Sequence, residues 1–106
     1  MKPIKLFKVL ANDTRLQILH WLRDPVRYFG AQLAETRVKH PHPVQVGVCV
    51  QLIQLKSGLS QSTISQFLTM LQDVELITAT RIGQWTYYRR NEVELSKIAQ
   101  YFLTEL

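Results

Sequence analysis

The sequence of 106 residues lacks several features that would assign it to a common class of protein. It holds one cysteine, Cys49, which excludes an intrachain disulfide framework and fits a reducing compartment. No run approaches the ~18 uninterrupted apolar residues of a membrane-spanning helix, and the first residues lead into no signal-peptide core. With 46% hydrophobic and 20% charged residues, the composition excludes an intrinsically disordered chain. We therefore expect a single domain over residues 1–106, located in the cytoplasm.

Motifs of catalysis are also scarce. The four glycines form no phosphate-binding loop, the carboxylates form no recognisable pair, and Cys49 has no base at a readable spacing. We therefore expect neither enzyme activity nor a bound cofactor. His40, His42 and Cys49 are chemically able to bind Zn²⁺, but a cysteine between valines is more often a small buried residue, so we expect no metal site.

The charge that is present is basic and unevenly distributed. Residues 1–43 hold eight basic and three acidic side chains, residues 44–90 hold four and two, and residues 91–106 are net acidic. The resulting net charge of +5 suggests an anionic partner, but it does not choose among nucleic acid, a membrane surface and an acidic protein.

Hydrophobic periodicity predicts two short helices at the start of the chain. Apolar residues recur at helical spacing from Pro3, and Asn12 offers a capping side chain for a second helix that Pro25 should end. The expected buried stripe of this second helix consists of Leu16, Ile18, Leu19 and Leu22.

The segment from 24 to 56 gives weaker signals. One or two helical turns could form over 29–35, whereas the prolines at 41 and 43 predict an extended loop because each disfavours helix in the residue before it. A short strand is possible before Gly47, and a helix is favoured over about 48–56, with Gly58 as a left-handed cap.

A helix with one polar face follows the glycine. Ser60 is placed to cap a helix over about 61–72, whose apolar face contains Ile64, Leu68 and Leu71. Two helices joined by a short turn with glycine are typical of a helix-turn-helix, in which the second helix enters the major groove of DNA.

The polar face of this helix is uncharged from Ser60 to Gln72, whereas an ordinary surface helix carries Lys or Glu there. Hydroxyls and amides both donate and accept hydrogen bonds, which is what reading base edges requires. We expect Ser60 and Gln61 to lie nearest the phosphates, and the candidates for base contact are Ser62, Thr63, Gln66 and Thr69. The full set of candidate DNA contacts on this helix is Ser60, Gln61, Ser62, Thr63, Ser65, Gln66 and Thr69.

A β-hairpin is predicted next. Residues 77–81 and 85–89 are rich in β-branched and aromatic side chains, with a turn at 82–84. Arg81 and Gln84 at the turn could reach the DNA backbone or minor groove. Arg89, at the base of the hairpin, could contact DNA or simply solvate a strand edge. A final helix with an apolar stripe is predicted over 94–106.

Three segments of the sequence resemble the ArsR/SmtB family of winged-helix repressors. Residues 10–19 (LANDTRLQIL) are similar to the family's opening, residues 58–71 (GLSQSTISQFLTML) to its recognition-helix segment, and residues 76–88 to its wing. The resemblance implies a mostly α-helical winged helix-turn-helix with a small β-hairpin, homodimeric through its terminal helices. It also implies a repressor that leaves a palindromic operator in double-stranded DNA when it receives a small-molecule or stress signal.

The sequence departs from the family pattern at several positions. Phe67 stands where the family commonly has His, which should alter packing or one DNA contact, and Glu75 stands where it commonly has Gly, which bears on the turn there. Cys49 lacks the second thiol of the family's thiolate sensor, and the last helix has no His or Asp for its other metal site. A winged-helix module that binds a protein instead of DNA is the alternative interpretation.

Overall fold

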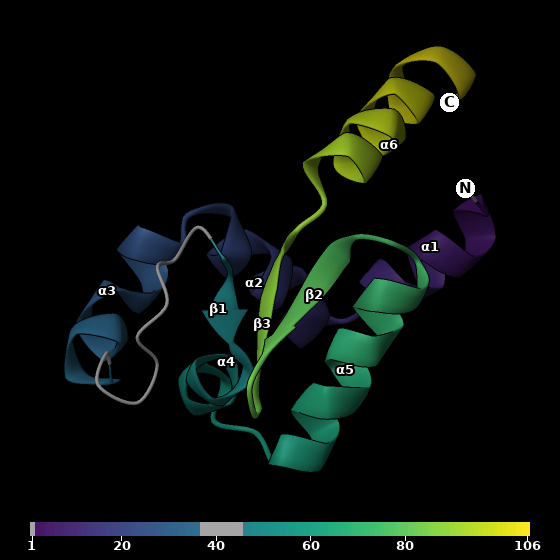
Figure 1. Cartoon of the computed structure of the whole chain (residues 1–106). Coiled ribbons are helices and arrows are strands. Elements are labelled where there is room, and N and C mark those ends of the chain that lie inside the picture. Colours follow the sequence, from purple (N-terminus) through teal and green to yellow (C-terminus); the bar gives the residue numbers. More distant parts are fainter. Residues whose placement is uncertain (1, 37–45) are drawn as a thin grey trace.

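The described part of the chain forms six α-helices and a three-stranded antiparallel sheet (Figure 1). The computed structural model describes residues 2–36 and 46–106. The strands lie in the order β1-β3-β2, so the predicted mostly α-helical winged helix-turn-helix is confirmed. The elements are α1 (Pro3–Leu10), α2 (Asp13–Arg23), α3 (Pro25–Thr36), β1 (Val48–Cys49), α4 (Val50–Ser57), α5 (Gln61–Asp73), β2 (Ile77–Ile82), β3 (Trp85–Arg90) and α6 (Glu92–Glu105).

A buried arginine joins the first two helices to α5. The side chain of Asn12 caps α2 by accepting a hydrogen bond from the Arg15 backbone N–H at 3.0 Å, as predicted. The Arg15 side chain is 8% exposed, donates its Nε–H to the carbonyl of Val9 near the end of α1, and lies 5.0 Å from the ring centroid of Phe67. The substitution of Phe67 for the family's His therefore acts on packing, through a cation–π contact.

The predicted buried stripe of α2 is wrong at one position. Ile18 and Leu22 are buried and Leu19 is half-buried, but Leu16 is 48% exposed. Arg15 lies one turn before Ile18 and takes the inward position, because its guanidinium satisfies carbonyls at the end of α1. The next residue, Leu16, consequently points to solvent.

Helix α3 is longer than the one or two turns expected from the sequence. Pro25 ends α2 as predicted, but it also begins α3, where the missing N–H of proline costs nothing. Asp24 accepts a hydrogen bond from the Arg27 backbone N–H at 3.3 Å, and the buried Phe29 meets Trp21 edge-to-face with ring centroids 6.3 Å apart. Tertiary packing thus extends a weakly signalled helix. The predicted loop around His40 lies outside the described residues.

An aromatic cage holds α3 against α4. The ammonium of Lys56, in the last turn of α4, lies 5.4, 5.7 and 5.8 Å from the ring centroids of Trp21, Tyr28 and Phe29 respectively. Contacts of this kind contribute about 0.5–2 kcal/mol depending on desolvation. Lys56 therefore connects the first helix of the helix-turn-helix to the two helices that precede it.

The short strand β1 begins after Gly47, and residues 44 and 45 of the strand considered possible before Gly47 lie outside the described part of the chain. Val48 pairs with Tyr88 and Cys49 with Tyr87, and α4 starts at the very next residue. Gly47 has φ +133°, and a Cβ there would lie 2.8 Å from the Tyr88 carbonyl oxygen. Only glycine permits this approach of the two strands, and pairing with a distant strand replaces the first turn of the expected helix.

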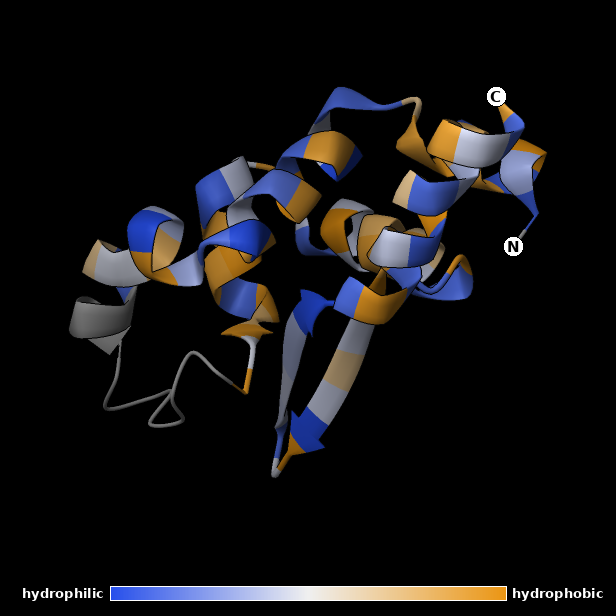
Figure 2. Ribbon diagram, turned by 90° about the horizontal axis from the view of Figure 1, so that it is seen from above, coloured by the Kyte–Doolittle hydropathy of each residue, from blue (hydrophilic) through white to orange (hydrophobic). Residues whose placement is uncertain are grey.

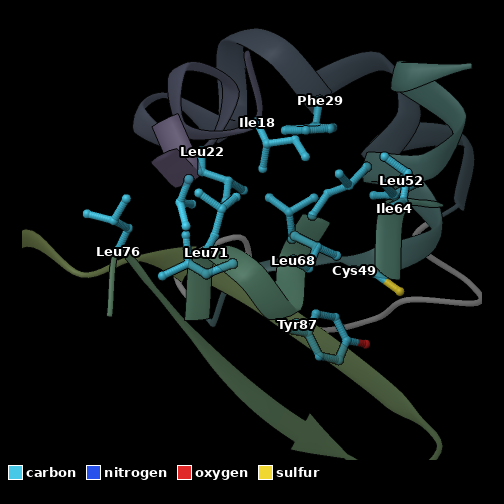
Figure 3. Close-up of a cluster of buried hydrophobic side chains, with 14 of the residues drawn as sticks. Ile18, Leu22, Phe29, Cys49, Leu52, Ile64, Leu68, Leu71, Leu76 and Tyr87 are labelled. Atoms are coloured by element: carbon cyan, nitrogen blue, oxygen red, sulfur yellow. The ribbon is translucent and has the colours of Figure 1, made fainter. Parts of the chain in front are cut away.

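The core lies between the helices and the inner face of the sheet (Figure 3). Ile64, Leu68 and Leu71 on α5 are fully buried, which confirms the predicted apolar face, and they meet Ile18 of α2 and Leu52 of α4 in one cluster. This packing fixes which face of α5 is left outside. Within residues 2–36 and 46–106, no helix has both the length and the apolar character needed to cross a membrane.

The end of α5 is a Schellman motif with glutamate in the place of glycine. The Leu76 N–H donates to the Leu71 carbonyl at 3.0 Å, and the Glu75 N–H donates to the Gln72 carbonyl at 2.8 Å. Glu75 has φ +63°, the left-handed conformation that glycine adopts without strain. The turn therefore keeps the geometry of the family's glycine although the residue has changed.

We expect Glu75→Gly to stabilise the protein by about 0.5–1 kcal/mol, because removing the left-handed strain outweighs the extra backbone entropy of glycine in the unfolded chain. Urea unfolding of the variant should show a higher midpoint with an unchanged slope. Glu75→Ala is the matched control, since it removes the carboxylate and keeps the strain. A gain with Ala equal to that with Gly would assign the effect to charge.

Candidate nucleic-acid interface

Three hydroxyls gather at the start of α5. The Ser60 hydroxyl accepts a hydrogen bond from the Thr63 backbone N–H at 3.2 Å and donates one to the Thr63 hydroxyl at 3.0 Å. The Ser62 hydroxyl lies 3.3 Å from that of Ser60. Gly58 provides the left-handed cap of α4 with φ +71°, as predicted. This end of α5, with its positive dipole and hydroxyl donors, suits contact with phosphate.

The outward face of α5 is polar and uncharged, as expected. Gln61, Ser62, Ser65, Gln66 and Thr69 are exposed, whereas Thr63 is half-buried. Ser65, Gln66 and Thr69 border one open stretch of surface together with the exposed Met70. The face thus presents hydrogen-bonding groups to a large partner.

The hairpin β2–β3 is the wing, and it projects from the helical body (Figure 2). Arg81 pairs with Thr86 one step before the turn, and its Nε–H donates to the Gly83 carbonyl at 3.1 Å. That bond uses only the Nε–H of the guanidinium. Its two terminal NH₂ groups can therefore still make a bidentate contact.

A groove brings α5, the wing and α4 together. Of the predicted contact residues, Gln61, Ser65, Arg81 and Gln84 line it, and its volume is about 380 Å³. In Figure 1, α4, the start of α5 and the turn of the wing lie at the same edge of the molecule. The lining residues contributed by α4 are Val50, Gln51 and Gln54.

Gln51 and Gln54 were not predicted from the sequence, where contacts were expected only on the helix after the glycine and on the hairpin. Their spacing of three residues places both amides on one side of α4. That spacing was a readable signal, but the groove it points into is formed only by tertiary packing.

Two groups of basic residues lie away from this groove. Arg89 pairs with Thr78 at the far end of the hairpin from its turn. Lys5 of α1 and Lys2, which precedes this helix, line a separate cavity with Asp73 and Glu75, at the opposite end of α5. The basic surplus of the N-terminal helix is therefore not beside the start of α5.

Cys49 is a core residue. It is 1% exposed and pairs with Tyr87, and burial raises the pKa of its thiol above the ordinary value. The predicted metal candidates His40 and His42 lie outside the described residues. Among the described ones, no group of three or more His, Cys, Asp or Glu side chains is arranged to hold a metal ion.

Comparison with known proteins bears on this architecture. No family model matches the chain. It is 44% identical, over its whole length and all of the relative's, to a Bacillus subtilis protein described as the uncharacterized HTH-type transcriptional regulator YbzH. It is 27% identical to the putative arsenical resistance operon repressor ArsR2 of Halobacterium salinarum, over 84% of this chain and 59% of that protein.

Solved structures agree with these relatives. The transcriptional regulator HlyU from Vibrio vulnificus is 28% identical, with a TM-score of 0.56 over 96% of this chain and 86% of that one. HlyU from Vibrio cholerae shares the fold at 24% identity, with a TM-score of 0.59 over 98% and 92% of the two chains. The chain therefore belongs to the ArsR/SmtB family of winged helix-turn-helix proteins, and it is a DNA-binding transcriptional regulator.

Proposed function

We propose that the protein is a homodimeric repressor that binds a palindromic operator in double-stranded DNA, with α5 in the major groove and the wing on the backbone or minor groove. The observation that carries this proposal is the exposed face of α5, which holds hydroxyls and amides without charge beside an arginine near the tip of the wing.

The contacts divide into reading and positioning. We assign base contact to Ser62, Gln66 and Thr69, because all three are exposed on the outward face of α5. Phosphate contact is assigned to residues at the start of α5 and on the wing, since such contacts fix register without reading sequence. The positioning residues are Ser60, Gln61, Ser65, Arg81, Gln84 and, outside the groove, Arg89. Thr63 supports the cap of α5, because its hydroxyl accepts from Ser60.

The dimer is proposed to form through α1 and α6. These helices lie at one end of the molecule (Figure 1). The rings of Phe7 in α1 and Phe102 in α6 meet with centroids 5.8 Å apart. Apolar side chains remain open to solvent beside this contact. Their exposed fractions are Ile4 67%, Phe102 47%, Leu103 82% and Leu106 73%. Such a patch on a small protein favours an interface between two copies.

A repressor needs a signal that releases it, and the signal proposed here is a small molecule or a stress. The proposed compartment is the cytoplasm, where the protein would share space with DNA and where a single thiol stays reduced.

The loss of a base contact and the loss of a phosphate contact should change DNA binding in different ways. We expect Gln66→Ala to cost about 1–3 kcal/mol of discrimination at one base pair of the operator. Arg81→Ala should weaken binding to all sequences and reduce the slope of log affinity against log salt by about 1. Both are measured by salt-titrated fluorescence anisotropy on duplexes selected from a random library.

Gln72→Ala is the matched control on the same helix, exposed but at its far end, and it should change neither quantity. Unchanged base preference in Gln66→Ala would refute the assignment of the reading face. A dimer that binds a protein partner and shifts no duplex at low salt would support the alternative of a protein-interaction module.

A further inference from the structure

The side chains that line the groove between α4 and the wing are mostly uncharged. Carboxamides approach it from three elements: Gln51 and Gln54 from α4, Gln61 from α5, and Gln84 from the turn of the wing. Arg81 contributes the one charged group among its lining residues, and none of them is acidic. Ten residues in all form the walls, and the remainder are small, hydroxylic or aromatic.

This chemistry suits one stretch of a phosphodiester chain. Amide N–H groups donate to phosphate oxygens without requiring a positive charge for each phosphate, and a single guanidinium adds a charge-assisted contact. The half-buried side chains of Trp85 and Tyr88 provide flat apolar walls of the kind that pack against sugar rings. The elements that line the groove, α4, the start of α5 and the turn of the wing, lie at the same edge of the molecule (Figure 1).

We propose that this groove seats the backbone of one operator strand, and that Gln51 and Gln54 are phosphate-positioning residues of the DNA interface. The inference rests on the proposed function, because it requires DNA to approach the face that contains the start of α5 and the wing. It adds the first helix of the helix-turn-helix to the interface and assigns it a role in orientation, not in reading bases.

The test uses the full-length protein and two duplexes of about 30 base pairs, long enough for two half-sites one helical turn apart. One duplex is selected by the wild-type protein from a random library, and the other has random sequence. We expect Gln51→Ala and Gln54→Ala each to weaken binding about 10- to 100-fold on both duplexes, as the loss of a hydrogen bond to a charged group does. Base preference and salt slope should stay unchanged, because an amide releases no counterion.

Gln54→Glu keeps the shape of the side chain and places a negative charge in the groove, so it should weaken binding at least as much as Ala. Gln17→Ala, which removes an exposed amide from α2, is the control and should bind like wild type. Thermal unfolding of every variant shows whether a loss of binding reflects a loss of fold.

Neutralising the phosphates one at a time locates the contact. A methylphosphonate at the position seated in the groove should weaken wild-type binding and have little further effect on the Gln51→Ala/Gln54→Ala double variant, because coupled groups are not additive. Folded variants that bind both duplexes like wild type, or that change base preference, would overturn the inference and leave the proposed function standing. A wild-type protein that selects no duplex from the random library would overturn the proposed function itself.

Discussion

Leu103→Glu is expected to dissociate the dimer and to reduce affinity for a palindromic operator by at least about 100-fold. The side chain is 82% exposed in the single chain, so glutamate costs the monomer fold little. In the proposed dimer the interface receives one unpaired carboxylate from each subunit, and burying such a charge costs about 3–5 kcal/mol. Sedimentation velocity measures the dissociation, and anisotropy on palindromic and half-site duplexes measures the loss of joint binding.

Val26→Glu is the matched control for this change. Val26 is an apolar residue of α3 with 64% exposure, and it lies outside the two terminal helices. This variant should remain dimeric and keep its operator affinity. If Leu103→Glu stays dimeric while Val26→Glu dissociates, the interface is formed by α3 and not by α1 and α6.

Leu68→Ala is expected to destabilise the protein by about 2–5 kcal/mol. Leu68 is fully buried in the middle of α5, and truncating it leaves a cavity that the close-packed neighbours fill only in part. For a domain of this size the loss lowers the melting temperature by about 10 °C or more. Circular dichroism during thermal and urea unfolding measures both quantities.

Met70→Ala, two residues further along the same helix, should cost less than about 1 kcal/mol because Met70 is 40% exposed. The pair tests which face of α5 is packed, and therefore which face is left for DNA. Equal costs at the two positions would contradict the orientation of the helix in this structure.

Local signals were sufficient for the elements that carry DNA recognition. The capping serine, the spacing of Ile64, Leu68 and Leu71, and the left-handed glycine each act within a few residues, so α5 and its preceding turn were predicted nearly to the residue. The hairpin was predicted for the same reason, since β-branched and aromatic residues flank a glycine turn.

The elements that were missed depend on partners distant in sequence. Strand β1 exists because Val48 and Cys49 pair with β3, about forty residues later. Helix α3 is extended by the packing of Phe29 on Trp21, and Leu16 is turned outward because Arg15 satisfies the carbonyls of α1. These contacts leave no periodic pattern within a short stretch of the sequence.

Only part of the candidate site was predicted from the sequence, again because tertiary packing brings some of its residues together. The uncharged face of α5 could be read from composition, whereas the contribution of Gln51 and Gln54 required the relative placement of α4 and the wing. The net charge was a poor guide, because three lysines of residues 1–10 belong to α1 or its start, and two of them lie at the far end of α5.

The direct join between β1 and α4 restricts how this protein can be switched. Cys49 is both the last residue of the strand that pairs with β3 and the residue that precedes α4, so no linker separates the wing from the helix-turn-helix. The angle between them is consequently not an independent degree of freedom. In the proposed dimer, a releasing signal would have to move the helix-turn-helix and the wing of one subunit together, as one rigid body, relative to those of the other subunit. The spacing of the two DNA-binding units along DNA would then change, whereas the shape of each unit would not.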